Sequence, residues 1–141
     1  MTVELISVGT EILLGNIVNS NAAYLSEKLA LLGLSCYHQS VVGDNEERME
    51  AAIRLAVSRS DIVILGGGLG PTKDDLTKET AVSFLKGKLV VHEPSLEHIT
   101  QIFIQSGRTV TESVKKQAYL PEGCIANGSS ALDEYLGNML Q

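Results

Sequence analysis

The chain has 141 residues, a formal net charge of −6 and 44% hydrophobic residues, which suits one domain with a substantial core. Only 4% of the residues are aromatic and none is Trp, so we expect an aliphatic core. The acidic balance leaves no basic stripe for nucleic acid, and no apolar run is long enough to cross a membrane. We therefore expect a soluble, cytoplasmic protein with no nucleic-acid and no membrane partner, in which Cys36 and Cys124 are reduced thiols.

The first part of the chain alternates between strand and helix patterns. Strands are predicted at residues 3–8 and 34–42, and the continuous apolar run at residues 62–65 predicts a third, buried strand. Apolar side chains at helical spacing predict helices at residues 22–32, 45–59 and 76–85. Strands that alternate with helices are typical of a mostly parallel sheet with helices on both faces, so we predict an α/β fold.

Polar residues mark where the expected helices begin. Ser20 or Asn21 is predicted to cap the first helix, and Asp44 with Glu47 is predicted to form a capping box for the second. The third helix is expected to turn one mixed face towards the core, formed by Leu76, Thr80, Ser83 and Phe84.

The rest of the chain predicts shorter elements. A strand is expected at residues 89–91, then a helix from Pro94 to about residue 106 and a short helix from its cap Thr111 to about residue 119. A turn, a strand, a second turn and a last helix are then expected at residues 120–123, 124–126, 127–130 and 131–141. No internal repeat or linker divides the chain, so we predict a single domain over residues 1–141.

A glycine-rich stretch after the third strand is the main candidate for a site. Residues 66–70 contain four glycines and precede Pro71, Thr72, Lys73 and the pair Asp74-Asp75. A strand, a glycine turn and a helix start form a common phosphate cradle, although neither a Walker A ending nor a first-strand GxGxxG pattern is present. The two carboxylates would repel a bare phosphate, so a divalent cation between them and the ligand is one interpretation. The alternative is a tight turn in which Asp75 caps the next helix.

Three loops are expected at the carboxyl ends of the predicted strands, at residues 9–21, 43–45 and 66–75. Parallel strands place these loops along one edge of a sheet, where ligands of such folds bind. The polar side chains that could converge there are Thr10, Glu11, Asn19, Asn21, Asp44, Thr72, Lys73, Asp74 and Asp75. The alternatives are that Glu11 and Lys73 are solvated and that Asp44 serves only as a helix cap. No Ser or Cys lies in a nucleophile-elbow pattern, so covalent catalysis has no support.

Four motifs, in this order and spacing, resemble the N-terminal domain of the competence/damage-inducible protein CinA. They are SVGTEILLG at residues 7–15, NSN at 19–21, VGDN at 42–45 and GGLGPTKDDLT at 67–77. The resemblance covers residues 3–123, and that domain belongs to the molybdopterin-binding superfamily that includes MogA, MoaB and part of MoeA. It implies a three-layer α/β sandwich with a nucleotide or pterin-like ligand at the strand ends. It also implies self-association into a homo-oligomer and, in the CinA-like branch, metal-dependent ADP-ribose pyrophosphatase activity.

The loop residues and this resemblance together define three sets of expected site residues. Asp75, the acidic residue before a Thr in the superfamily's motif, and Lys73 are expected to be catalytic. The expected ligand contacts are glycines, hydroxyls and amides of the three loops: Gly9, Thr10, Asn19, Asn21, Gly67, Gly68, Gly70 and Thr72. A divalent ion (Mg²⁺, Mn²⁺ or Co²⁺) is expected on carboxylates, namely Asp75, Asp74, Glu11 and Asp44.

The sequence departs from the CinA pattern after the Pro-Glu-Gly turn at residues 121–123. Neither the NPxGTAPG segment nor the later LPGPP segment of that family is present, and the C-terminal amidohydrolase-type domain of many CinA proteins is also absent. We therefore expect a fragment, a truncated form or a diverged stand-alone form in which one wall of the cleft is missing. A pterin- or nucleotide-binding module without turnover is the alternative function, and an interaction domain whose loops are merely turns is a third.

Overall fold

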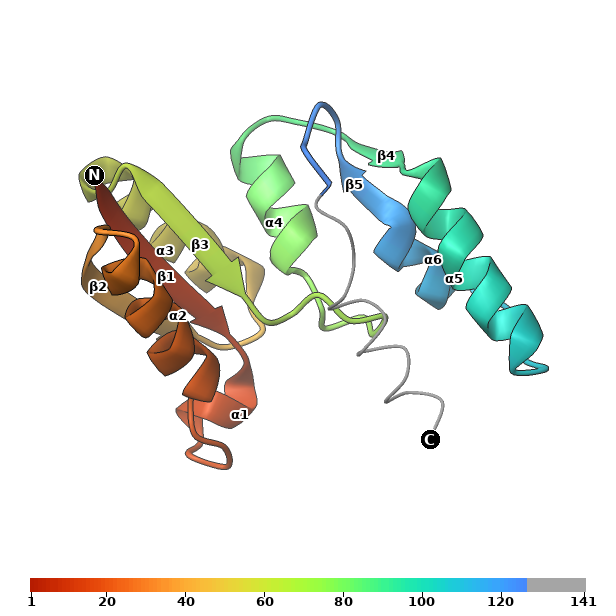
Figure 1. The fold of residues 1–141 in the computed structure, drawn as a ribbon, viewed down its shortest axis with the longest axis horizontal. Coiled ribbons are helices and arrows are strands. Elements are labelled where there is room, and N and C mark those ends of the chain that lie inside the picture. The colour runs from red at the N-terminus through yellow and green to blue at the C-terminus, as the bar shows by residue number, and fades with distance from the viewer. Residues whose placement is uncertain (127–141) are drawn as a thin grey trace. The chain divides into compact units, whose positions relative to one another are not determined.

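The computed structural model describes residues 1–126, which divide into two compact units with their boundary between Lys86 and Gly87 (Figure 1). The first unit holds three strands and four helices. In chain order these are β1 (Thr2–Val8), α1 (Thr10–Leu13), α2 (Ser20–Leu31), β2 (Ser35–Val42), α3 (Glu46–Arg59), β3 (Ile62–Gly66) and α4 (Thr77–Phe84). This alternation confirms the predicted α/β rhythm of the first part of the chain.

The three strands of the first unit form a parallel sheet in the order β2-β1-β3. At the carboxyl end of the sheet, Val8 of β1 pairs with Val42 of β2, and Ser7 pairs with Gly66 of β3. All three strands therefore end at one edge. The loops that follow them lie at that edge, as predicted.

The side chains of β1 alternate between two cores because successive residues of a strand point to opposite faces. Val3 and Leu5 pack with Ala22 and Leu29 of α2. Ile6 and Val8 pack on the other face with three buried residues of α3, Met49, Ile53 and Ala56. Two side chains of α4, Ala81 and Phe84, join this second core. Helices thus cover both faces of the sheet, which confirms the predicted three layers (Figure 1).

The second unit is built on a two-stranded antiparallel sheet. Its strands are β4 (Leu89–Val91) and β5 (Tyr119–Pro121), and its helices are α5 (Glu93–Gln105), α6 (Glu112–Lys115) and a 3₁₀ turn, η1 (Lys116–Ala118). The core consists of Ile99, Phe103, Val114 and Ala118. Thr111 caps α6 by accepting from the Val114 amide, as the sequence predicted.

Two predicted helix caps are wrong, by one or two residues. Asn19, rather than Ser20 or Asn21, caps α2, since its Oδ1 accepts from the Ala22 amide at 3.3 Å. Asn45, rather than Asp44, caps α3 through the Arg48 amide at 3.0 Å. The reason for the second shift is tertiary, because the Asp44 carboxylate is bound to a residue of another loop.

Other predictions failed where contacts distant in sequence decide the structure. On α4, Ser83 is exposed, whereas Thr77 and Val82 are buried with Thr80. Residues 119–121 form a strand, where the end of a helix and the first half of a turn were expected, because the non-local partner β4 pairs with them. Residues 124–126 are not a strand. The turn expected at 127–130 and the helix expected at 131–141 lie outside the described residues.

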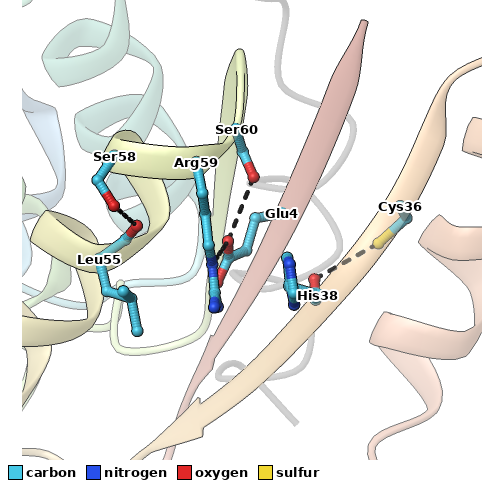
Figure 2. A network of polar contacts seen from close by, with 7 residues as sticks. All are labelled: Glu4, Cys36, His38, Leu55, Ser58, Arg59 and Ser60. Atoms are coloured by element: carbon cyan, nitrogen blue, oxygen red, sulfur yellow. Dashed lines mark hydrogen bonds and ion pairs between the residues drawn. The ribbon is translucent and has the colours of Figure 1, made fainter.

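An ion pair between a buried carboxylate and an exposed arginine ties the end of α3 to the central strand. Glu4 lies on the α3 face of β1 with 1% of its surface exposed. Its carboxylate accepts two hydrogen bonds from Arg59, from Nε at 2.9 Å and Nη2 at 2.7 Å, and a third from Ser60 at 3.3 Å (Figure 2). The Arg59 hydrogen bonds hold the pKa of Glu4 below its usual value, against the opposing effect of burial, and His38 on β2 makes a smaller contribution.

We predict that Arg59→Ala lowers the free energy of unfolding several times more than the loss of a surface ion pair does, because it leaves a buried carboxylate without its partner. Arg54→Ala is the matched control, since Arg54 is on the same helix and pairs with Glu50 on the surface. Its cost is expected to stay below about 1 kcal/mol. Urea unfolding of both variants checks this, and equal losses would contradict the importance of burial.

The lowered pKa of Glu4 also predicts a pH dependence. A carboxyl whose pKa is lower in the folded state stabilises the protein above its unfolded value and loses that contribution as the pH falls. The stability difference between the wild type and Glu4→Gln should be largest near neutral pH and shrink as the pH drops below 4.5. Unfolding curves across this range measure it, and a difference that does not change with pH would contradict the assignment.

Candidate functional site

The glycine loop crosses directly over the carboxyl end of β1. Gly67 has a φ of 94°, and a Cβ built on it would lie 2.1 Å from the carbonyl oxygen of Val8. Gly68 has a φ of 60°, and its Cβ would lie 2.3 Å from Oγ1 of Thr77. Both the left-handed backbone and the close approach require glycine at these two positions. The backbone of the loop therefore packs directly against the end of the sheet, with no side chain between them.

Thr77, the first residue of α4, holds this loop. Its side chain is buried, its Oγ1 donates to the carbonyl of Gly67 at 2.7 Å, and its amide donates to the carbonyl of Gly68 at 3.2 Å. Thr77 is not among the site residues expected from the sequence. A Thr that directly follows the Asp74-Asp75-Leu76 segment at a helix start was the available signal.

A second pair joins the loop after β1 to the loop after β2. The Asp44 carboxylate accepts from the Thr10 amide at 3.1 Å and from its hydroxyl at 2.7 Å. In return, the Thr10 hydroxyl accepts from the Asp44 amide at 3.2 Å. The two predicted site residues therefore do come together, and they bind each other.

A pocket of about 120 Å³ lies beside the glycine loop, between the ends of β1 and β3 and the start of α2. Of the predicted residues, Glu11, Asn19, Asn21 and Gly67 line it. Ser7, which was not predicted from the sequence, lines it too and accepts from Nδ2 of Asn19 at 2.9 Å. The wall also contains apolar side chains, among them Ile12 and Ile17. Polar groups and an apolar wall in one concave site suit a small-molecule ligand with both kinds of surface.

The acidic segment before α4 forms a turn of its own. The Asp75 carboxylate accepts from the Thr72 amide at 2.9 Å and from its hydroxyl at 2.5 Å. Asp75 is therefore not the cap of α4, which begins two residues later with Leu76 in the cap position and no side-chain cap. Lys73 and Asp74 are exposed. None of the predicted site residues at positions 72–75 lines the pocket beside α2.

The carboxylates expected to hold a metal are distributed over separate loops. Among residues 1–126, no three His, Cys, Asp or Glu side chains lie close enough together to form a metal site. Asp44 is bound to Thr10 and Asp75 to Thr72, while the Glu11 carboxylate folds back so close to Gly9 that a Cβ there would lie 2.5 Å from its Oε1. The oxygen donors suit a hard cation in the mode in which Mg²⁺ uses one or two carboxylates and takes its other ligands from water and substrate phosphate.

Comparison with known proteins identifies the family. The family model described as a probable molybdopterin binding domain matches residues 4–132. The protein CinA of Thermoplasma acidophilum has a similar structure, with a TM-score of 0.79 and 34% identity, covering 88% of this chain and 72% of that one. This chain belongs to the CinA-like molybdopterin-binding-domain family. The resemblance seen in the four sequence motifs is thereby confirmed.

Two further relatives set the scope of the match. The competence-damage inducible protein of Alkaliphilus oremlandii is 56% identical over 125 residues, which are 89% of this chain and 30% of that protein. This CinA-like chain therefore spans about a third of the length of the curated relatives it matches. The molybdopterin biosynthesis enzyme MoaB of Thermus thermophilus has the same fold, with a TM-score of 0.59 and 17% identity over 85% of this chain and 78% of that one. No helix within residues 1–126 is long and apolar enough to span a bilayer.

The close approach of the glycine loop to the end of β1 predicts that alanine lowers stability strongly at residue 67 but not at residue 66. Gly67→Ala should lower the free energy of unfolding by about 2–4 kcal/mol, because the new Cβ meets the Val8 carbonyl in a left-handed backbone. Gly66→Ala is the matched control, since nothing lies within 4 Å of a Cβ at that position. Its effect is expected to stay within about 1 kcal/mol. Thermal or urea unfolding of both variants decides this, and a tolerated Gly67→Ala would show that the crossing is not tight.

Proposed function

We propose that this CinA-like domain binds ADP-ribose or a related nucleotide pyrophosphate at the carboxyl edge of its sheet and hydrolyses it with the help of a divalent cation. One observation carries the proposal: the loop at Gly67 and Gly68 lies over the end of β1 beside a pocket with mixed polar and apolar walls. Glycines allow a phosphate to approach the backbone closely, and backbone amides attract its charge.

The start of α2 supports an anionic ligand. Asn21 and Ala22, from its first turn, line the pocket together with the cap residue Asn19. A helix N-terminus carries a partial positive charge that favours phosphate or another anion. The pocket is small compared with the roughly 300–1,000 Å³ of a typical ligand site. It suits one part of a nucleotide, with the rest of the ligand lying over the open loops.

The acidic loop residues supply the proposed chemistry. Asp75, with Asp74, Glu11 and Asp44 as further candidates, would hold Mg²⁺, Mn²⁺ or Co²⁺ together with the phosphate oxygens of the ligand. Such an ion neutralises phosphate charge and lowers the pKa of a water molecule. Lys73 is exposed, so its ammonium is free to reach a phosphate and stabilise charge that develops on it. The Thr72 hydroxyl keeps the Asp75 carboxylate in place.

A binding module without turnover is the second candidate. The observation that favours it is the separation of the carboxylates, since no three of them form a cluster among the described residues. The matching family is described as a probable molybdopterin binding domain, so a pterin is the ligand to test first. Calorimetry with ADP-ribose and with a pterin, each with and without Mg²⁺, separates the two candidates. Tight binding without released product favours the module.

We predict that Asp75→Asn lowers metal-dependent turnover of ADP-ribose by about 100-fold or more, because it removes the charge that would hold the cation. The amide oxygen of Asn can still accept from Thr72, so the melting temperature should change by no more than about 2 °C. Asp61→Asn is the matched control, because Asp61 lies at the opposite end of β3, where it binds Thr2.

Phosphate-bearing products released with Mg²⁺, Mn²⁺ or Co²⁺ give the readout of this test. Unimpaired turnover in Asp75→Asn would remove Asp75 from the mechanism. A large loss of stability in the absence of metal would instead assign Asp75 a structural role, the closure of its turn with Thr72.

A further inference from the structure

We propose that Thr77 is a positioning residue that aims the backbone amides of Gly68 and Leu69 at an anionic group of the ligand. The inference rests on the proposed function, in which the glycine loop holds a phosphate. Thr77 binds the carbonyls of two successive residues, Gly67 through its hydroxyl and Gly68 through its amide. Its side chain is 1% exposed, so the hydroxyl has no access to solvent as an alternative partner.

The directions of these two carbonyls fix the directions of the N–H groups in the same peptide units. A trans peptide unit is planar, and its N–H points opposite to its C=O. The described part of the chain contains no cis peptide bond. Since the carbonyls of Gly67 and Gly68 point at Thr77, the N–H groups of Gly68 and Leu69 point away from α4.

Both amides are available to a ligand. Within residues 1–126, neither the Gly68 nor the Leu69 amide donates to a protein acceptor. The loop is exposed at Gly67 and Leu69. Two adjacent, unpaired N–H groups held in one direction bind anions because they need not be reoriented when the ligand arrives.

The hydrogen bond from Thr77 to the Gly67 carbonyl also requires glycine at position 68. A Cβ on Gly68 would lie 2.3 Å from the Thr77 hydroxyl, so a side chain there would displace the hydroxyl from the Gly67 carbonyl. The Thr77 hydroxyl can therefore reach the Gly67 carbonyl only because residue 68 has no side chain. Together the hydroxyl and the glycine keep both carbonyls turned inward.

Thr80 provides a close chemical control on the same helix. It lies one turn after Thr77, is 2% exposed, and its hydroxyl has no hydrogen-bond partner among the described residues. Thr80→Val therefore changes a buried hydroxyl to a methyl group on α4 without touching the glycine loop. Thr77→Val makes the same chemical change and removes the anchor of the Gly67 carbonyl.

The test is a titration of the ¹⁵N-labelled 141-residue chain with inorganic pyrophosphate, followed through the amide resonances of Gly68 and Leu69. In the wild type, and in Thr80→Val, both resonances should shift saturably with the same affinity. Thr77→Val should bind about tenfold more weakly, the usual effect of one lost hydrogen bond. Thr77→Ser keeps the hydroxyl and should restore affinity to within about threefold of the wild type.

Three results would overturn the inference: amides of Gly68 and Leu69 that do not respond in the wild type, Thr77→Val that binds as the wild type does, or Thr80→Val that loses as much as Thr77→Val. If Thr77→Val does not fold, Thr77→Ser still decides, because a serine that fails to restore binding also contradicts the proposal. Hydrolysis of ADP-ribose is measured separately. Its absence, with these amide shifts intact, would overturn the proposed reaction and leave the role of Thr77 standing.

Discussion

The passage of the glycine loop over the end of β1 is the contact on which the rest of the site depends. The Val8 carbonyl leaves no room for a side chain on Gly67, and the Thr77 hydroxyl leaves none on Gly68. These two approaches hold the start of α4 against the end of the sheet, and Gly67 and Val8 line the pocket beside α2. A larger residue at position 67 would push the loop away from the strand end and displace part of the pocket wall, and one at position 68 would displace the Thr77 hydroxyl.

The polar groups at the two ends of the sheet differ in whether they have hydrogen-bond partners. At the amino end, Glu4 is paired with Arg59, and Asp61 accepts from the amide and hydroxyl of Thr2, so the polar groups there are bound to one another. At the carboxyl end, the amides of Gly68 and Leu69 have no acceptor among the described residues. Open polar groups cost stability, and they are usually found where a ligand completes them.

The same Asp–Thr hydrogen-bonding pattern occurs twice in the loops at the carboxyl edge. Asp44 accepts from the amide and hydroxyl of Thr10, and Asp75 does the same with Thr72. Each pair holds its loop in one conformation, and the carboxylate oxygens can still accept further hydrogen bonds. This arrangement suits both proposed functions, since a charged group fixed in advance loses little entropy when it binds a ligand or a cation. A homo-oligomeric state and a cytoplasmic location stay predictions.

The sequence by itself determined the strands of the parallel sheet, the helices α2, α3 and α4 and the edge where the loops gather, because apolar periodicity and glycine placement are local properties. The short helix α1 was not predicted, since residues 9–21 were expected to form a loop. It also indicated the family, through four motifs that are specific in their order and spacing. Only the tertiary structure decided that Asn45 rather than Asp44 caps α3, that residues 119–121 form a strand, and that Thr77 anchors the loop. Each of these outcomes depends on a partner outside the segment itself: Thr10 for Asp44, β4 for β5, and the carbonyls of Gly67 and Gly68 for Thr77. No local pattern encodes such a partner, because it comes within hydrogen-bonding distance only when the chain has folded.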